Sequence, residues 1–142
     1  VAATVIAGGK DTWDVRAMPA AVFTDPEIAT VGLGEAEAKD AGHERRIGTC
    51  PFAASGRALA GREAEGMVKM ICDAQDDRIL GVHMVGPHAS ELIAEAALAI
   101  EAGLTSEDLA LTVHTHPTLA EATMEAAEDV HRMAVHIYNP KR

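Results

Sequence analysis

Short apolar segments separated by turn residues fill the first two thirds of the chain and predict β-strands. Each segment ends near glycine, proline or acidic residues, which commonly bound strands. The expected strands are 20–24, 28–32, 45–52, 66–72 and 78–86. The last two flank the acidic run 73–77, and this arrangement predicts a β-hairpin. Between the strands, we expect a short helix at 34–42 and a small-residue loop or short helix at 53–64.

The hydrophobic spacing changes after residue 88 and predicts helices in the last third of the chain. Apolar residues recur three or four positions apart over 89–102 and are followed by Gly103, which indicates an amphipathic helix. Thr105 and Asp108 have the spacing of a capping box and predict a second, short helix. Strands first and helices last predict an α+β fold, in which helices pack on an antiparallel sheet.

Charge and cysteine content narrow the classes of protein. The 142 residues are enough for one domain, and 22 acidic against 12 basic residues give a formal net charge of −10. This balance argues against nucleic acid or an anionic membrane as partner. No apolar run approaches the roughly 20 residues that cross a bilayer. Cys50 and Cys72 match neither a redox Cys-x-x-Cys pair nor a zinc knuckle, so we expect buried thiols in a reducing, cytoplasmic protein.

The start of the chain predicts a piece of a longer protein. The sequence does not begin with Met, and residues 1–9 have the pattern of a helix end followed by two glycines. A helix that opens at the first residue without a capping residue is expected to continue upstream.

The densest polar group follows the second predicted helix and contains His114, His116 and Glu121. One hypothesis for it is structural. Thr118 and Glu121 have capping-box spacing and predict a long helix from Thr118 to about Val135. In that case the two histidines are ordinary loop residues.

Two chemical hypotheses compete with capping. His114 and His116 can both ligate zinc, with Glu121 or His83 completing the ligand set, although a lone His-x-His is a weak signal. Alternatively, Glu121 contacts His116 and makes it a general base, because a carboxylate on one ring nitrogen fixes the tautomer and raises basicity. Spacing alone leaves these hypotheses open.

Several blocks of sequence resemble one known family, the pyridine nucleotide–disulphide oxidoreductases. The resemblance covers about residues 1–137. Within the family, the run His-x-His-Pro-Thr-Leu-x-Glu of this sequence is most similar to that of members that oxidise dihydrolipoamide. Members that reduce glutathione disulfide or mercuric ions, and a stand-alone dimerisation module, are the alternatives. The blocks are Phe23 to Gly32, Pro51-Phe52 with Arg57-Ala58, Ile79 to Pro87, Glu91-Leu92-Ile93 with Glu95, and His114 to Ala122.

The resemblance implies an FAD domain, an NAD domain and a C-terminal interface domain in the full-length enzyme. Residues 1–10 then correspond to the tail of a preceding FAD-domain helix, and 11–142 to the interface domain. That domain forms a homodimer, in which we expect helices 89–102 and 118–135 and the sheet to meet their copies.

The chain lacks the family's cofactor and redox motifs. Gly32-Leu33-Gly34 is its nearest approach to a dinucleotide-binding run, but Glu37 stands where the third glycine is needed, so we expect a plain turn. The family's redox cysteine pair is also absent. We therefore expect this piece alone to bind neither FAD nor NAD and to be inactive.

The resemblance also implies roles for individual residues. His116 is the base that takes a proton from a dihydrolipoamide thiol beside the partner subunit's disulfide and flavin, and Glu121 orients it. His116 and Pro117, joined by a cis bond, lie near the partner's FAD, and His114 lines the substrate channel. Lipoyl domains of 2-oxoacid dehydrogenase complexes are the implied partners, and no metal is expected. The remaining histidines are expected to have no functional partner: His43, His83, His88, His131 and His136.

Overall fold

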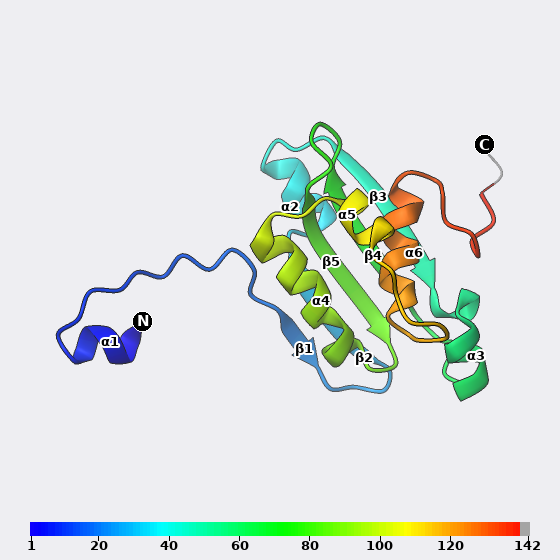
Figure 1. Cartoon of the computed structure of the whole chain (residues 1–142), viewed down its shortest axis with the longest axis horizontal. Helices are drawn as coiled ribbons and strands as arrows, with labels where there is room; N and C mark the ends of the chain where they lie inside the picture. Colours follow the sequence, from blue (N-terminus) through cyan, green and yellow to red (C-terminus); the bar gives the residue numbers. More distant parts are fainter. Residues whose placement is uncertain (140–142) are drawn as a thin grey trace.

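A five-stranded antiparallel sheet forms the centre of the computed structural model, which describes residues 1–139 (Figure 1). The strands lie in the order β1-β2-β5-β4-β3, so β2, β5 and β4 are flanked on both sides while β1 and β3 form the edges. They are β1 (Ala20–Val22), β2 (Glu27–Gly32), β3 (Arg45–Pro51), β4 (Met67–Asp73) and β5 (Ile79–Gly86). The predicted β4–β5 hairpin is confirmed.

Three helices cover one face of the sheet (Figure 1). Helix α4 (Ala89–Ala102) contacts β2 and β5, α6 (Glu121–Val130) contacts β3 and β4, and α5 (Ser106–Leu111) packs against α6. The other helical segments are short: α1 (Ala2–Ile6), α2 (Glu35–Asp40), the 3-10 helix η1 (Phe52–Ala54) and α3 (Gly56–Gly61). The structure therefore confirms the predicted α+β fold.

The hydrophobic core lies between the sheet and these helices, where apolar surface is removed from water. Alternate residues of the central strands contribute to it, among them Val68, Met70, Cys72, Val82 and Met84. Small residues let α6 approach the sheet closely: a Cβ atom on Gly48 of β3 would overlap the carbonyl oxygen of Ala126 and the amide nitrogen of Val130. This close approach fixes the position of α6, which begins at Glu121.

The helix predicted from Thr118 to about Val135 is shorter at both ends. It begins at Glu121, because the Thr118 hydroxyl donates to the Thr115 carbonyl oxygen at 2.8 Å instead of capping the helix. It ends at Val130, and Arg132 then adopts a left-handed backbone with φ of 59°, which turns the chain back. The predicted boundaries were therefore wrong by about a turn at each end.

Helix α1 stands away from the sheet at the end of an extended segment (Figure 1). Every residue from 1 to 16 is exposed, and α1 buries none of its side chains. The assignment of residues 1–10 to a preceding domain stays a prediction. So does the domain 11–142, whose last residues, 140–142, lie outside the described part. Among residues 1–139, no helix has the length and apolar character needed to cross a membrane.

Candidate active site

His116 lies in the loop between α5 and α6, beside the start of α6. Its Nδ1 is 2.8 Å from Glu121 Oε1, and the His116–Pro117 peptide bond is cis, as the resemblance implied. The His116 side chain is 75% exposed, whereas that of Glu121 is only 20% exposed. One ring nitrogen is therefore held by the carboxylate, while the side that carries Nε2 faces solvent.

Glu121 holds the loop and the histidine at the same time. Its second oxygen, Oε2, accepts the backbone N–H of Thr118 at 2.7 Å. Burial acts to raise the pKa of Glu121, but the Thr118 N–H and His116 outweigh it and leave the pKa below its ordinary value. An ionised carboxylate only accepts hydrogen bonds, so Nδ1 of His116 carries the proton and Nε2 is the basic nitrogen.

The capping and acid–base hypotheses for Glu121 are thus compatible. The carboxylate accepts the N–H of Thr118, as in a capping box, but Thr118 lies in the loop before α6 and its hydroxyl bonds to Thr115, so this contact holds the loop. The same carboxylate also contacts the histidine. The arrangement can orient His116 as a general base and stabilise the imidazolium that forms.

The side chain of His114 is buried and contacts residues other than Glu121. Its Nε2 contacts Glu95 Oε1 on α4 at 2.8 Å, its Nδ1 contacts the Thr112 carbonyl oxygen at 2.8 Å, and its side chain is 7% exposed. Both ring nitrogens are engaged, so His114 ties the loop to α4. Its place along a substrate channel stays a prediction. Among residues 1–139, no three His, Cys, Asp or Glu side chains form a group able to hold a metal ion.

Four of the remaining histidines have partners, which the sequence analysis did not foresee. His136 Nδ1 lies 2.5 Å from Glu125 Oε1, and His43 Nδ1 lies 2.6 Å from Asp73 Oδ2. The other two contacts join His131 to Asp77 and Ser106, and His83 to the Leu33 carbonyl oxygen. The one available signal was Glu125, an acidic residue one turn after Glu121 on the same helix face.

A cavity of about 220 Å³ joins the two histidine–carboxylate pairs at α6. It is lined by His116, Glu121, Glu125 and His136 together with Cys50 and the start of α3. Both cysteines are free and buried, as predicted. Burial, aided by the charge of Glu125, raises the pKa of Cys50 to about 12, so this thiol stays protonated near neutral pH. Cys50 is a wall of the cavity and no nucleophile.

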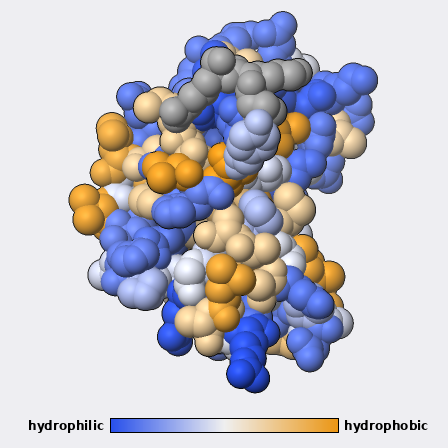
Figure 2. Space-filling model, turned by 90° about the vertical axis from the view of Figure 1, so that its right-hand side faces the viewer, coloured by the Kyte–Doolittle hydropathy of each residue, from blue (hydrophilic) through white to orange (hydrophobic). Residues whose placement is uncertain are grey.

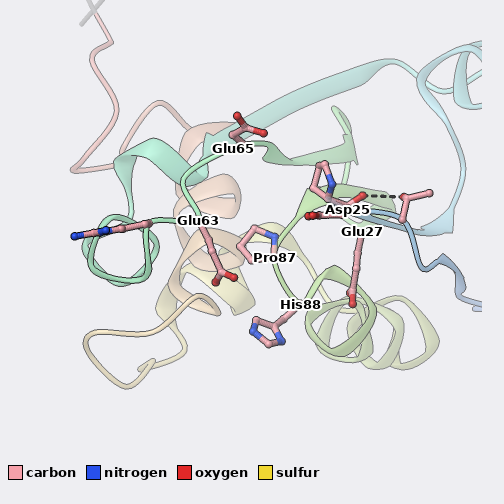
Figure 3. Close-up of a pocket in the computed structure, with 9 residues that line it drawn as sticks. Asp25, Glu27, Glu63, Glu65, Pro87 and His88 are labelled. Carbon is pink, nitrogen blue, oxygen red and sulfur yellow. Dashed lines mark hydrogen bonds between the residues drawn. The ribbon is translucent and has the colours of Figure 1, made fainter.

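A larger hollow, of about 550 Å³, lies elsewhere, between the start of β2 and the start of α4 (Figure 3). Asp25, Glu27, Glu63, Glu65 and His88 line it. The Glu27 carboxylate accepts the Ser90 N–H at 2.9 Å, which supports the first turn of α4 and lowers the pKa of Glu27. The hollow contains no predicted site residue, so size alone does not mark the site.

The turn between β2 and α2 does not fit a dinucleotide. The Gly34 N–H, which would have to face a pyrophosphate, donates to Glu37 Oε2 at 2.7 Å instead. Gly32 has a positive φ of 74°, and Leu33 N–H bonds to the Leu80 carbonyl oxygen. These N–H groups are therefore used within the protein, as in the plain turn that the sequence predicted.

An antiparallel sheet covered by helices, with an exposed histidine–glutamate pair, is the arrangement that the sequence resemblance implied for an interface domain. A comparison with known protein families gives the same assignment. Residues 18–127 match the family described as pyridine nucleotide-disulphide oxidoreductase, dimerisation domain. The chain belongs to this family.

Among the members of this family, the chain is similar to proteins named dihydrolipoyl dehydrogenase. The chain is 55% identical to a dihydrolipoyl dehydrogenase of Haloferax volcanii and 56% identical to one of Halobacterium salinarum, over 98% of this chain and 29% of each relative. Among solved structures, LpdA from Mycobacterium tuberculosis is similar with a TM-score of 0.79 and 31% identity, over 89% of this chain and 28% of that one. The flavoprotein disulfide reductase RclA from Escherichia coli matches with a TM-score of 0.79 and 30% identity, over 84% and 28%. The chain thus spans less than a third of the length of these relatives.

Proposed function

We propose that this chain is the dimerisation domain of a dihydrolipoyl dehydrogenase and supplies the base His116 to the active site of the partner subunit. The observation that carries the proposal is the His116–Glu121 pair at 2.8 Å, held in a fixed loop with the far side of the ring open. Support comes from relatives of that name that are more than half identical.

The chemistry falls to Nε2 of His116. It accepts a proton from a thiol of dihydrolipoamide, and the resulting thiolate, which is the reactive form, attacks a disulfide of the partner subunit. The disulfide bond breaks, a mixed disulfide forms and one cysteine leaves as a thiolate; the second thiol of dihydrolipoamide then displaces the other cysteine, which yields lipoamide and a reduced cysteine pair. Glu121 keeps the proton of the neutral ring on Nδ1, so Nε2 is free to accept the next one. FAD and NAD, bound by other parts of the full-length enzyme, take up the electrons when present.

A homodimer accounts for the exposure of the pair. A base that is 75% exposed is open to water, and a partner subunit that covers it would exclude that water and strengthen the electrostatic interactions of the pair. The face that carries α3 and the C-terminal segment has apolar patches between hydrophilic areas (Figure 2). Exposed apolar side chains of this region include Leu59, Val113, Met133 and Val135. Their contact with a second copy would remove them from water.

The remaining assignments follow from the same proposal. His116 and Pro117 lie near the flavin of the partner subunit, and His114 holds the loop at the wall of the substrate channel. The full-length enzyme serves lipoyl domains of 2-oxoacid dehydrogenase complexes in the cytoplasm.

The test is His116→Gln in the full-length enzyme. We expect oxidation of dihydrolipoamide to slow by about a hundredfold or more, the range for loss of a general base. Reduction of ferricyanide by NADH, which needs no thiol deprotonation, should be preserved and shows that the flavin site is intact. Undiminished oxidation of dihydrolipoamide would contradict the proposal.

A further inference from the structure

A second histidine–carboxylate pair lies directly beside the first. Glu125 follows Glu121 by four residues, so both carboxylates lie on one face of α6. Glu125 Oε1 accepts from His136 Nδ1 at 2.5 Å, and its Oε2 accepts the His136 backbone N–H at 3.3 Å. Both pairs line the 220 Å³ cavity.

The Glu125 carboxylate is buried, with 6% of its side chain exposed, and such a charge is costly without a partner. The charge of Glu125 changes the pKa values of neighbouring groups. Burial and Glu125 raise the pKa of Glu128, and the hydrogen bond to Glu125 raises the pKa of His136. His136 therefore tends to be protonated and to neutralise Glu125.

The pair is the polar anchor of the segment that follows α6. Within residues 134–139, both hydrogen bonds that reach the rest of the described chain go to Glu125. Ala134 is buried and Ile137 packs against the core, while Val135 and Tyr138 are exposed. Without the pair, few contacts would keep the segment against the cavity.

The groups around His136 connect the anchor to the site. Glu125 contacts it from α6, and the charges of Glu121 and Glu128 on the same helix further raise the pKa of His136. Cys50 of β3 and His116 of the loop line the same cavity. The charge of His136 also helps keep the pKa of Glu121 low, after the larger effects of burial, the Thr118 N–H and His116. A protonated His136 thus favours the ionised Glu121 that orients His116.

We propose that Glu125 and His136 are positioning residues for the His116–Glu121 pair: their contact holds segment 134–139 in place and fixes His136 in the wall of the cavity that both pairs share. This inference rests on the proposed function of His116. It assigns a role to two residues that do not touch the substrate.

The experiment uses the full-length enzyme with three variants. His136→Ala removes the anchor, while His136→Asn keeps an amide N–H close to the position of Nδ1. His131→Ala is the matched control, because it breaks another histidine–carboxylate contact, with Asp77, at the far end of α6. Each variant is measured by hydrogen–deuterium exchange of segment 133–139 and by kcat, KM and the pH profile with dihydrolipoamide.

For His136→Ala, we expect faster exchange in segment 133–139 and a loss of kcat/KM of about tenfold, since small displacements of a catalytic group cost up to about a hundredfold. The midpoint of the pH–rate profile should also shift. His136→Asn should restore slow exchange and most of kcat/KM, and His131→Ala should change neither.

Two outcomes overturn the inference. Exchange and kinetics of His136→Ala equal to those of His131→Ala would show that the pair does not hold the segment. If His136→Ala had faster hydrogen–deuterium exchange in segment 133–139 but unchanged kcat and KM, the pair would anchor the segment without positioning His116. Failure of the proposed function has a separate signature, because His116→Gln would then retain activity whatever segment 133–139 does.

Discussion

The two ends of α6 both carry a histidine next to a carboxylate, yet they differ in what the ring can do. At the start, Glu121 holds Nδ1 of His116 and leaves the other side of an exposed ring open. At the end, Nε2 of His131 is itself engaged, at 3.0 Å from Ser106 Oγ and 3.1 Å from Asp77 Oδ1. The Ser106 hydroxyl is fully buried and donates to Asp77, so it is no nucleophile.

The comparison shows that a histidine–carboxylate contact does not by itself indicate catalysis. Asp77 also accepts the backbone N–H of Glu107 at 3.1 Å, so the cluster at the end of α6 links α5, α6 and the β4–β5 turn. The His116 side chain makes fewer contacts with other elements than the His131 cluster does, and more of its surface is exposed to solvent. The exposure of the ring, 75% for the His116 side chain against 32% for that of His131, distinguishes the candidate base from the structural tie.

The largest effect on stability is expected from a change that displaces the whole of α6, with the histidine pairs at both its ends. Gly48→Val puts side-chain atoms where the Ala126 carbonyl and the Val130 N–H now lie, so α6 must move off β3. We expect a loss of about 3 kcal/mol in the free energy of unfolding, at the upper end for an overpacked site. Urea unfolding measures it, and a stability within error of the parent would contradict the close packing of α6.

A change at the structural end should affect stability without affecting chemistry. Asp77→Ala removes the acceptor of Ser106, Glu107 and His131, and we expect a loss of about 2 kcal/mol in the free energy of unfolding. Asp77→Asn is the control, because asparagine tolerates the left-handed backbone at this position, with φ of 64°, and keeps an acceptor oxygen. An equal loss in both variants would argue against the hydrogen bonds as the cause.

A change at the start of α6, where His116 lies, should affect catalysis without affecting stability. Glu121→Gln keeps an oxygen that can accept from Thr118, so the melting temperature should barely move. It removes the charge beside His116, so turnover of the full-length enzyme should fall, by less than the roughly hundredfold loss expected for His116→Gln. The midpoint of the pH–rate profile should shift to lower pH. A lowered melting temperature with an unchanged pH profile would leave Glu121 with capping alone.

The smallest expected effects are the pH dependences of stability. The folded-state pKa of Glu121 lies below 4.5, so its contribution is present above that pH and is lost as pH falls through the lowered pKa. The pKa of His136 lies above 6.5, so its contribution is present below pH 6.5 and is lost as pH rises through the raised pKa. Melting temperatures from about pH 3 to pH 9 measure both. The acid slope should flatten in Glu121→Gln and the alkaline slope in His136→Asn.

Local signals in the sequence predicted much of this molecule. The helix expected at 89–102 is observed at Ala89–Ala102, because its apolar spacing is regular and Gly103 follows it in a left-handed conformation. The pairing of His116 with Glu121 spans only five residues, and motif and geometry agree on it.

Contacts distant in sequence escaped prediction. His43 and Asp73 are 30 residues apart, and Ser106 and His131 are 25 apart. Only the tertiary fold, through the sheet for the first pair and the packing of α5 on α6 for the second, brings them together. The start of α6 was misplaced because Thr118 and Glu121 have capping-box spacing, whereas the Thr118 hydroxyl is used within the loop. His136 was missed because the turn at Arg132, which returns the chain to Glu125, has no strong local signature.

The central claim is that His116 acts on the active site of the other subunit, and mixed dimers test it most directly. One full-length variant carries His116→Gln, and the other lacks the redox cysteines that lie outside this chain. Each is inactive alone, but a mixed dimer places an intact His116 opposite an intact disulfide. After random exchange, half of the dimers are mixed, so about a quarter of the parent activity with dihydrolipoamide should return. No recovery, with mixed dimers shown to form, would contradict the claim.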